Sequence, residues 1–343
     1  MAAREPRICV FGAGSVGCLL GGLLGREAPV VLIGRQRLAD EIAVHGLNLT
    51  SWRGEQMRLA PGAVRYATDV DAAATADLVL VTVKCVDTEE VAGMLAALLQ
   101  ETAIVISFQN GLRNAEVLRR ALPRQIVLAG MVPFNVVRRG EGRFHRASEG
   151  ELMVESAPAL ASFAPIFARA GLPLVPRNDM PAVQWAKLLL NLNNPINALS
   201  DLPLREELAR RDYRRCLALA QREALGALNA AGITPAKLTP LPARWIPPLL
   251  EMPDALFRAL AAGMLAIDPL ARSSMWEDLQ ARRGTEIDFI NGEVTHLARS
   301  LGLCAPVNER LVALIRAAEA GERRRWGAAD LLAALQEATP SMA

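Results

Sequence analysis

A lysine and several asparagines interrupt a leucine-rich segment in the second half of the chain, residues 185–200, WAKLLLNLNNPINALS. On a helical wheel of about 100° per residue, Asn191 lies at about 40° and Asn194 at about −20° from Lys187. Leucines and a tryptophan occupy the opposite side, and Asn193 and Asn197 flank the polar stripe. Because burying an ammonium and two amides without partners is costly, the stripe must face water, protein partners or a ligand.

The side chains of this stripe suit the chemistry of an active site. An ammonium group can hydrogen-bond an oxygen, stabilise its growing negative charge and release a proton to it. The alternative is that the stripe faces bulk solvent. Against that alternative, the stripe lacks the Glu, Arg and Gln that are usual on a solvated face, and asparagine is a poor helix former. The Asn-Pro pair is also expected to bend or end the helix at Asn194.

A glycine-rich loop near the N-terminus is a second chemical feature. An apolar, β-rich run at residues 7–11 precedes it, a helical segment follows, and a second apolar run occupies residues 29–35. In the G-x-G-x-x-G pattern, Gly12 permits a tight turn, Gly14 leaves room for a pyrophosphate, and Gly17 lets helix and strand pack closely. The alternative is a packing junction that binds no ligand. The residues assigned to the cofactor here are Gly12, Ala13, Gly14, Ser15, Val16 and Gly17.

The ends of three expected strands carry further candidates. An acidic residue after the second strand would favour NAD. Arg35 stands there instead and can pair with a 2′-phosphate, which predicts NADP(H). The alternative is that Arg35 is a solvated loop residue. Lys84 ends the apolar run at residues 76–84, and Asn110 ends the run at residues 102–111. Ligands bind beyond the carboxyl ends of strands in open α/β sheets, so both residues are expected to contact cofactor or substrate. Alternatively, they are ordinary strand-end residues.

The order of the expected elements predicts an α/β protein with two domains. Residues 1–179 alternate strands and helices, as in a Rossmann-type doubly wound sheet, and the apolar runs at residues 125–137 and 172–179 are expected to extend it. Residues 180–343 show helical periodicity alone and predict an all-α substrate and catalytic domain. Within it, the proline-rich segment 235–253 cannot form a continuous helix and is expected to be a structured loop near a cleft.

Composition excludes several classes of protein. The net charge of +2 and the scattered basic residues argue against nucleic-acid binding. Five widely spaced cysteines and three distant histidines form no metal or disulfide pattern, which favours a cytoplasmic protein with reduced thiols and no metal site. The basic start and uncharged run of the N-terminus resemble a signal peptide or a membrane span, but the glycine spacing favours the soluble loop, with no membrane partner. The helical half is compatible with a homodimer.

Several blocks of the chain, in order, resemble the ketopantoate reductase (2-dehydropantoate 2-reductase) family. FGAGSVG is similar to the family's nucleotide loop, and VTVK and SFQNG are similar to its other cofactor-side signatures. WAKLLLNLNNPINAL resembles its Trp-x-Lys helix with downstream asparagines. The most specific block is SSMWEDLQARRGTEIDFINGEV at residues 273–294, and APVNERLVALI at residues 305–315 resembles the closing helix.

The resemblance implies a reaction and assigns roles. NADPH would deliver hydride to the C2 ketone of 2-dehydropantoate, a small 2-oxo acid, giving pantoate on the route to pantothenate and coenzyme A. Lys187 matches the family's general acid, and Glu286 matches a catalytic glutamate near the lysine and the nicotinamide. The other matched positions are Asn191, Asn194 and Ser274 for the substrate, Lys84 for the cofactor, and Asn110 for both.

The spacing of the second asparagine departs from the family pattern. Asn194 follows Lys187 one residue sooner than its counterpart does, and Pro195 comes next. Reduction of another 2-oxo acid is therefore one alternative. A second alternative is a β-hydroxyacid dehydrogenase of the 6-phosphogluconate or hydroxyisobutyrate type, whose helix also carries a Lys-x-x-x-Asn pair. A third alternative is a non-catalytic NADPH-binding regulator. The block at residues 273–294 argues against the β-hydroxyacid dehydrogenases, and the joint presence of Lys187 and Glu286 argues against a regulator.

Overall fold

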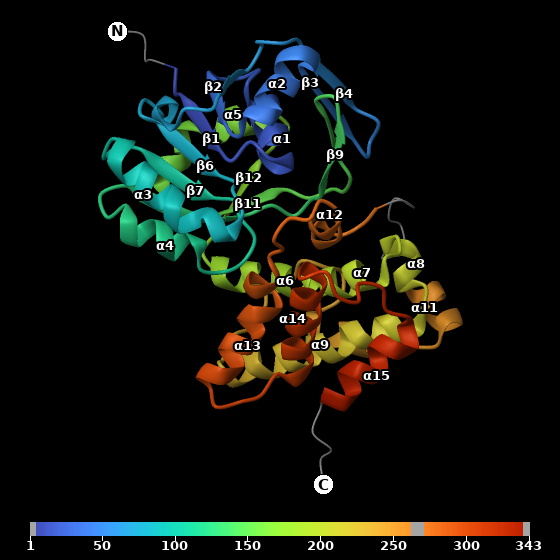
Figure 1. Ribbon diagram of the computed structural model, residues 1–343. Coiled ribbons are helices and arrows are strands. Elements are labelled where there is room, and N and C mark those ends of the chain that lie inside the picture. Colours follow the sequence, from blue (N-terminus) through green and yellow to red (C-terminus); the bar gives the residue numbers. More distant parts are fainter. Residues whose placement is uncertain (1–4, 262–270, 339–343) are drawn as a thin grey trace. The chain divides into compact units, whose positions relative to one another are not determined.

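The computed structural model describes residues 5–261 and 271–338. The chain forms two compact units, residues 1–180 and residues 181–343 (Figure 1). The first unit combines sheets with helices, and in the described part of the second unit every regular element is a helix. The predicted fold class, an α/β protein with a helical second half, is confirmed.

The main sheet of the first unit has eight strands. Its order is β12-β11-β8-β7-β6-β1-β2-β5, in which the six strands from β8 to β5 run parallel. That run has the strand order of a Rossmann fold, and its winding reverses between β1 and β6. The bounds are β1 Ile8–Phe11, β2 Val30–Ile33, β5 Arg65–Ala67, β6 Leu78–Val81, β7 Ile104–Ser107, β8 Ile126–Met131, β11 Leu152–Glu155 and β12 Leu174–Arg177.

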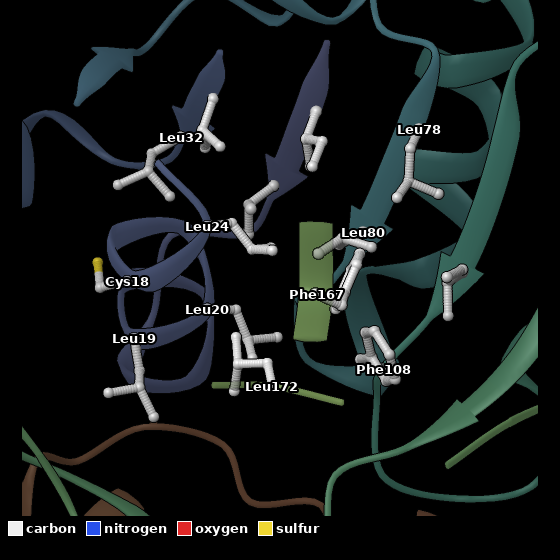
Figure 2. Packing of buried hydrophobic residues seen from close by; sticks show 14 of the residues in the cluster. Cys18, Leu19, Leu20, Leu24, Leu32, Leu78, Leu80, Phe108, Phe167 and Leu172 are labelled. Atoms are coloured by element: carbon white, nitrogen blue, oxygen red, sulfur yellow. The ribbon is translucent and has the colours of Figure 1, made fainter. Parts of the chain in front are cut away.

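Both faces of this sheet are buried. Because side chains alternate along a strand, Ile8 and Val10 of β1 enter one apolar cluster, whereas Cys9 and Phe11 enter the other. Figure 2 shows the first cluster, where leucines of helix α1 (Ser15–Leu24) and Phe167 of α5 (Ala164–Arg169) meet strand residues. Helices α3 (Thr88–Leu98) and α4 (Asn114–Ala121) supply residues to the second cluster. The burial of both faces explains the nearly continuous apolar runs of the central strands.

A separate four-stranded sheet corrects one expectation. Its order is β4-β3-β10-β9, with bounds Gln56–Leu59, Leu47–Ser51, Arg143–Arg146 and Val136–Gly140. The apolar run at residues 125–137 was expected to extend the main sheet, but only β8 does so, because Pro133 interrupts the run and β9 pairs with β10. Arg138 of β9 pairs with Glu41 of α2 (Gln36–His45), which also accepts from the Gly142 amide, so this small sheet is tied to α2.

Helices alone form the described part of the second unit. The long helix α9 packs against α8, α10, α13, α14 and α15. Residues 235–242 lack regular structure, and the prolines that follow lie at the first turn of α10, where a missing N–H group is tolerated. The bounds are α6 Met180–Asn191, α7 Asn194–Ser200, α8 Leu204–Leu208, α9 Arg211–Ala230, η4 Ala243–Trp245, α10 Ile246–Leu250, α11 Asp254–Leu260, α12 Ser274–Gln280, η5 Ile287–Phe289, α13 Asn291–Ser300, α14 Pro306–Glu319 and α15 Ala328–Ala338.

Two segments with helical periodicity are each divided into shorter helices. The segment 205–232 contains α8 and α9, with a break at residues 209–210. The segment 273–302 contains α12, the short η5 and α13. In the second case Arg282 has φ of +50°, a left-handed conformation that ends α12, and Gly284 weakens any continuation. None of the helices in the described ranges is both long and apolar enough to cross a membrane.

Candidate functional site

The glycine-rich loop lies where the winding of the main sheet reverses. Gly12 has φ of +112°, and a Cβ atom there would lie 2.5 Å from the Val83 amide nitrogen. A Cβ atom at Gly17 would lie 2.3 Å from the Gly12 carbonyl oxygen, which also accepts a 2.7 Å hydrogen bond from Thr82 Oγ1. Gly12 and Gly17 are therefore required by the close approach of the loop, helix α1 and the end of β6.

Gly14 differs from its two neighbours in the motif. A Cβ atom there would meet no described atom within 4 Å, and Gly14 is the N-cap residue of α1. Within the described ranges, the amides of Ser15, Val16 and Gly17 donate to no protein acceptor. Open space in front of free amides at the positive end of a ten-residue helix fits a phosphate group.

Arg35 lies at the end of β2, where it is the N-cap residue of α2 and is exposed. Its carbonyl oxygen accepts from the Tyr66 hydroxyl at 3.3 Å. The guanidinium group bonds to no residue in the parts of the chain that the structure describes. A bidentate cation is therefore available at the strand end that contacts the ribose in Rossmann folds.

The ends of β6 and β7 are joined by buried hydrogen bonds. Gln109 Nε2 donates to Thr88 Oγ1 at 2.7 Å and to the Lys84 carbonyl oxygen at 3.5 Å. The Asn110 carbonyl oxygen accepts from Cys85 Sγ at 2.9 Å. The structure thus brings Lys84 and Asn110 to one polar network at the edge where ligands of open α/β sheets bind.

Sequence reasoning missed the residues that hold this network together. Thr88, Gln109 and Asn114 are all buried, although each has a polar side chain. Asn114 Nδ2 donates to the Asn110 carbonyl oxygen and its Oδ1 accepts from Thr88. Polar residues directly after an apolar strand were the available signal, because buried polar groups at such a position require partners.

Lys187 is a partly exposed residue of helix α6, and its neighbours Trp185, Leu188 and Leu189 are buried. Within the described chain no hydrogen bond or ion pair engages the ammonium group, so no pair with Glu286 forms. Burial lowers the pKa of Lys187 from 10.5 to about 8. An ammonium that is desolvated and unpartnered gives up a proton more readily than an exposed lysine does.

The polar helix is interrupted, but it ends three residues before Asn194, where the Asn-Pro pair was expected to bend or end it. Helix α6 ends at Asn191 and α7 begins at Asn194. The Asn193 amide donates to the Leu190 carbonyl oxygen at 3.4 Å, and the Leu189 carbonyl oxygen that it would meet in a regular helix accepts instead from Gln221 Nε2 at 3.0 Å. The uniform wheel therefore holds for Lys187 and Asn191 and does not hold beyond them.

This break changes the placement of two asparagines. Asn193 and Asn197 were expected beside the polar stripe, but they are 8% and 0% exposed. Their Nδ2 groups donate to Oε2 of the buried Glu207, at 3.2 Å and 2.9 Å. Asn191 and Asn194, in contrast, remain partly exposed, and their side-chain amides bond to no described residue.

Ser274 begins helix α12, and Glu286 follows the turn after that helix. Ser274 is the exposed first residue of α12, and Glu286 is a partly exposed residue that precedes η5. The adjacent Ser273 donates from Oγ to the Asn194 carbonyl oxygen at 3.1 Å. Ser274 and Asn194, two of the predicted substrate residues, are therefore linked through one intervening side chain.

The described cysteines form no disulfide, and the described histidine, cysteine and acidic side chains form no cluster suited to a metal ion. The fold and the glycine loop thus define a Rossmann-type oxidoreductase with a helical second unit. Two family models match the chain: "Ketopantoate reductase PanE/ApbA" over residues 8–159 and "Ketopantoate reductase PanE/ApbA C terminal" over residues 179–319. The chain belongs to the ketopantoate reductase family.

Individual relatives agree with this membership. The 2-dehydropantoate 2-reductase of Halobacterium salinarum is 29% identical over 321 residues, which cover 91% of this chain and 99% of that protein. A PanE/ApbA family ketopantoate reductase from Ralstonia eutropha JMP134 superimposes with a TM-score of 0.78 at 30% identity, covering 92% of this chain and 99% of that one. A ternary complex of D-mandelate dehydrogenase with NADH and anilino(oxo)acetate has a TM-score of 0.76 at 19% identity, covers 92% and 99%, and shows a likeness of fold alone.

Proposed function

We propose that this enzyme reduces the C2 ketone of 2-dehydropantoate to pantoate with NADPH, and that Lys187 is the general acid. The nicotinamide cofactor supplies the hydride when bound. The protein must then place a proton donor beside the ketone oxygen, because that oxygen gains negative charge as hydride reaches the carbon. The similarity to the 2-dehydropantoate 2-reductase of Halobacterium salinarum supports this substrate.

The state of Lys187 carries the proposal. Its ammonium is desolvated, and it is not paired with any carboxylate among the described residues. A purely structural lysine at such a position would be expected to find a partner, because an unpaired charge that is partly withdrawn from water is costly. A pKa of about 8 keeps Lys187 mostly protonated near neutral pH and still lets it release the proton.

The remaining assignments combine two unpartnered amides with similarity to the family. Asn191 and Asn194 present unpartnered amides on the elements that carry or follow Lys187, and we assign them to the substrate. Ser274 is assigned to the substrate carboxylate and Glu286 to the neighbourhood of the lysine and nicotinamide, both by similarity to the family. Asn110 is assigned to cofactor and substrate on the same basis.

The cofactor assignment combines an open phosphate cradle with a free cation. Gly14 and the amides after it fit a pyrophosphate, and Ala13 belongs to the same loop. Arg35 is exposed and unpartnered at the ribose end of β2, with no carboxylate at that place to prefer NAD. Lys84 completes the set of proposed cofactor contacts.

The direct test is NADPH oxidation with 2-dehydropantoate, run beside a panel of other 2-oxo acids. We expect the highest kcat/KM for 2-dehydropantoate and a severe loss of kcat in Lys187→Ala, with the affinity for NADPH nearly unchanged. Lys237→Ala is a control for the loss of a lysine, because Lys237 is an exposed lysine of the same unit to which no role in the reaction is assigned. A mild loss of kcat in Lys187→Ala would remove Lys187 as the acid.

One observation favours a second candidate, the reduction of a different 2-oxo acid. Asn194 follows Lys187 one residue sooner than in the family pattern, and residues 192–193 interrupt the helix between α6 and α7. A substrate held by the Asn194 amide would then meet a differently placed donor. Higher kcat/KM for another member of the panel would support this candidate and would leave the role of Lys187 intact.

A further inference from the structure

A buried acidic group lies behind the turn between α6 and α7. Glu207 of α8 is 0% exposed, and its Oε2 atom accepts from the side-chain amides of Asn193 and Asn197. No ion pair engages Glu207 within the described residues. Tyr213 and Cys216 of the adjoining helix α9 interact with it electrostatically, and both lack positive charge. Burial and the amides of Asn193 and Asn197 account for the shift in the pKa of Glu207, and no charged group contributes to it.

The buried cation of α9 is committed elsewhere. The Arg214 guanidinium is 0% exposed and donates to the carbonyl oxygens of Leu208, Leu250 and Met252. It also pairs with Asp254 at 2.9 Å. These bonds engage all three guanidinium nitrogens, so Arg214 does not balance a negative charge on Glu207.

Two unpartnered oxygens indicate the protonation state of Glu207. Oε1 of Glu207 and Oδ1 of Asn193 are both buried, and each lacks a hydrogen-bond donor. A proton on Oε1 of Glu207 would make that atom a hydrogen-bond donor. The Asn193 side chain already donates from its nitrogen to Oε2 of Glu207, and its oxygen is an available acceptor. A two-bond pairing of acid with amide would satisfy both oxygens. Burial also raises the pKa of Glu207 to about 8.

Hydrogen bonds connect this acid to the proposed substrate residues. Asn197, which donates to Glu207, accepts at Oδ1 from the Ser273 amide at 2.9 Å. Ser273 in turn donates from Oγ to the Asn194 carbonyl oxygen at 3.1 Å. Ser274 follows Ser273 directly, so the bonds reach both substrate residues from one buried carboxyl group.

We propose that Glu207, as a neutral carboxylic acid, is a positioning residue of the keto-acid site. It holds Asn193 in the turn between α6 and α7, and through Asn197 and Ser273 it fixes Asn194 and Ser274. This inference rests on the proposed function, because it assumes that Asn194 and Ser274 bind the substrate. Glu207 itself transfers no proton to the substrate.

The kinetic test uses variants at one position with a neighbour as control. Glu207→Ala leaves Asn193 and Asn197 without their acceptor, so we expect KM for 2-dehydropantoate to rise by roughly tenfold or more. KM for NADPH should change little. Glu207→Gln mimics the neutral acid and should restore KM for the keto acid to within about twofold of the wild type. Glu206→Ala, an exposed change on the same helix, should have no effect.

Other outcomes overturn the inference. If Glu207→Ala lowers the thermal midpoint but leaves KM for the keto acid unchanged, Glu207 serves only the fold. If Glu207→Gln is as impaired as Glu207→Ala, the group acts as a carboxylate. Should Glu207→Ala fail to fold, Ser273→Ala removes the bond to the Asn194 carbonyl, and Ser273→Thr keeps a hydroxyl there. The alanine variant alone should then raise KM for the keto acid, and equal KM values would refute the proposal.

Infrared spectroscopy of protein labelled with ¹³C-glutamate reads the protonation state without turnover. We expect a protonated carboxyl band in the wild type near neutral pH that is absent from Glu207→Gln. Its absence from the wild type would refute the neutral acid even in a fully active enzyme. If the wild type reduces no 2-oxo acid, the proposed function fails and the positioning role fails with it, whereas a missing band refutes the inference about Glu207 alone.

Discussion

Replacing Lys187 by methionine should make the protein more stable and nearly inactive. Methionine keeps an unbranched apolar side chain on α6 and removes the unpartnered charge. The loss of a general acid costs about 10²- to 10⁴-fold in rate. A gain in stability is unusual when a partly buried residue is replaced, and here it follows from the cost of holding an ammonium in apolar surroundings.

The size and pH dependence of this gain follow from the shifted pKa. Folding lowers the pKa of Lys187 from 10.5 to about 8, and each pKa unit corresponds to about 1.4 kcal/mol, so charged Lys187 destabilises the folded state by at most about 3 kcal/mol. Between these pKa values the unfolded chain binds more protons than the folded chain. The penalty is therefore fully present below pH 8 and falls to about 1 kcal/mol or less near pH 10.

The assay is the midpoint of denaturation for wild type and Lys187→Met at about pH 7 and about pH 10. We expect the variant to unfold at a higher denaturant concentration at the lower pH, with the difference shrinking at the higher pH. Leu190→Met, a change to the same residue on the same helix, controls for methionine itself. A variant less stable than the wild type at both pH values, or a gain independent of pH, would refute the claim that Lys187 is a desolvated and unpartnered cation.

Three further outcomes test the site. kcat/KM should fall as pH rises through about 8, because Lys187 must be protonated to act as the general acid. This decline should persist in Glu207→Gln. A rate that stays level to about pH 10 would contradict the assignment of Lys187 as the acid. Arg35→Asp should weaken NADPH binding far more than NADH binding in fluorescence titrations, and equal losses would defeat the 2′-phosphate contact. Gly14→Ala should leave the thermal midpoint unchanged but raise the dissociation constant for the cofactor. Gly17→Ala should instead lower the thermal midpoint, because an added Cβ atom at Gly17 would lie 2.3 Å from a backbone oxygen and one at Gly14 would meet no described atom within 4 Å.

The sequence predicted best those strands whose burial is uniform. The strands β1, β6 and β7 are buried along their whole length, so each gives a short, nearly continuous apolar run. The small sheet escaped prediction because its strands are half-exposed. Its strand β4, for example, reads Gln56-Met57-Arg58-Leu59 and alternates exposed with partly buried residues over only four positions. Alternation over so few residues is not distinguishable from a polar loop.

The glycine loop and the polar helix were predictable to different degrees. The three glycines act through backbone conformation and close approach, which the motif specifies by itself. The placement of Asn193 and Asn197 instead depends on Glu207. Glu207 lies on the separate helix α8 and meets the two asparagines only in the folded chain. No local rule predicts such a partner.

The broken helix explains how one short segment can carry two sets of asparagines. In a continuous helix, four asparagines and a lysine would spread over much of the circumference and compete with the leucines for the core. The break at residues 192–193 separates them: Asn191 and Asn194 keep free amides, while Asn193 and Asn197 turn to a buried acid. The proline after Asn194 is compatible with this because its missing N–H group falls in the first turn of α7. The same interruption that weakens the helix thus lets the segment both present two free amides and anchor itself in the core.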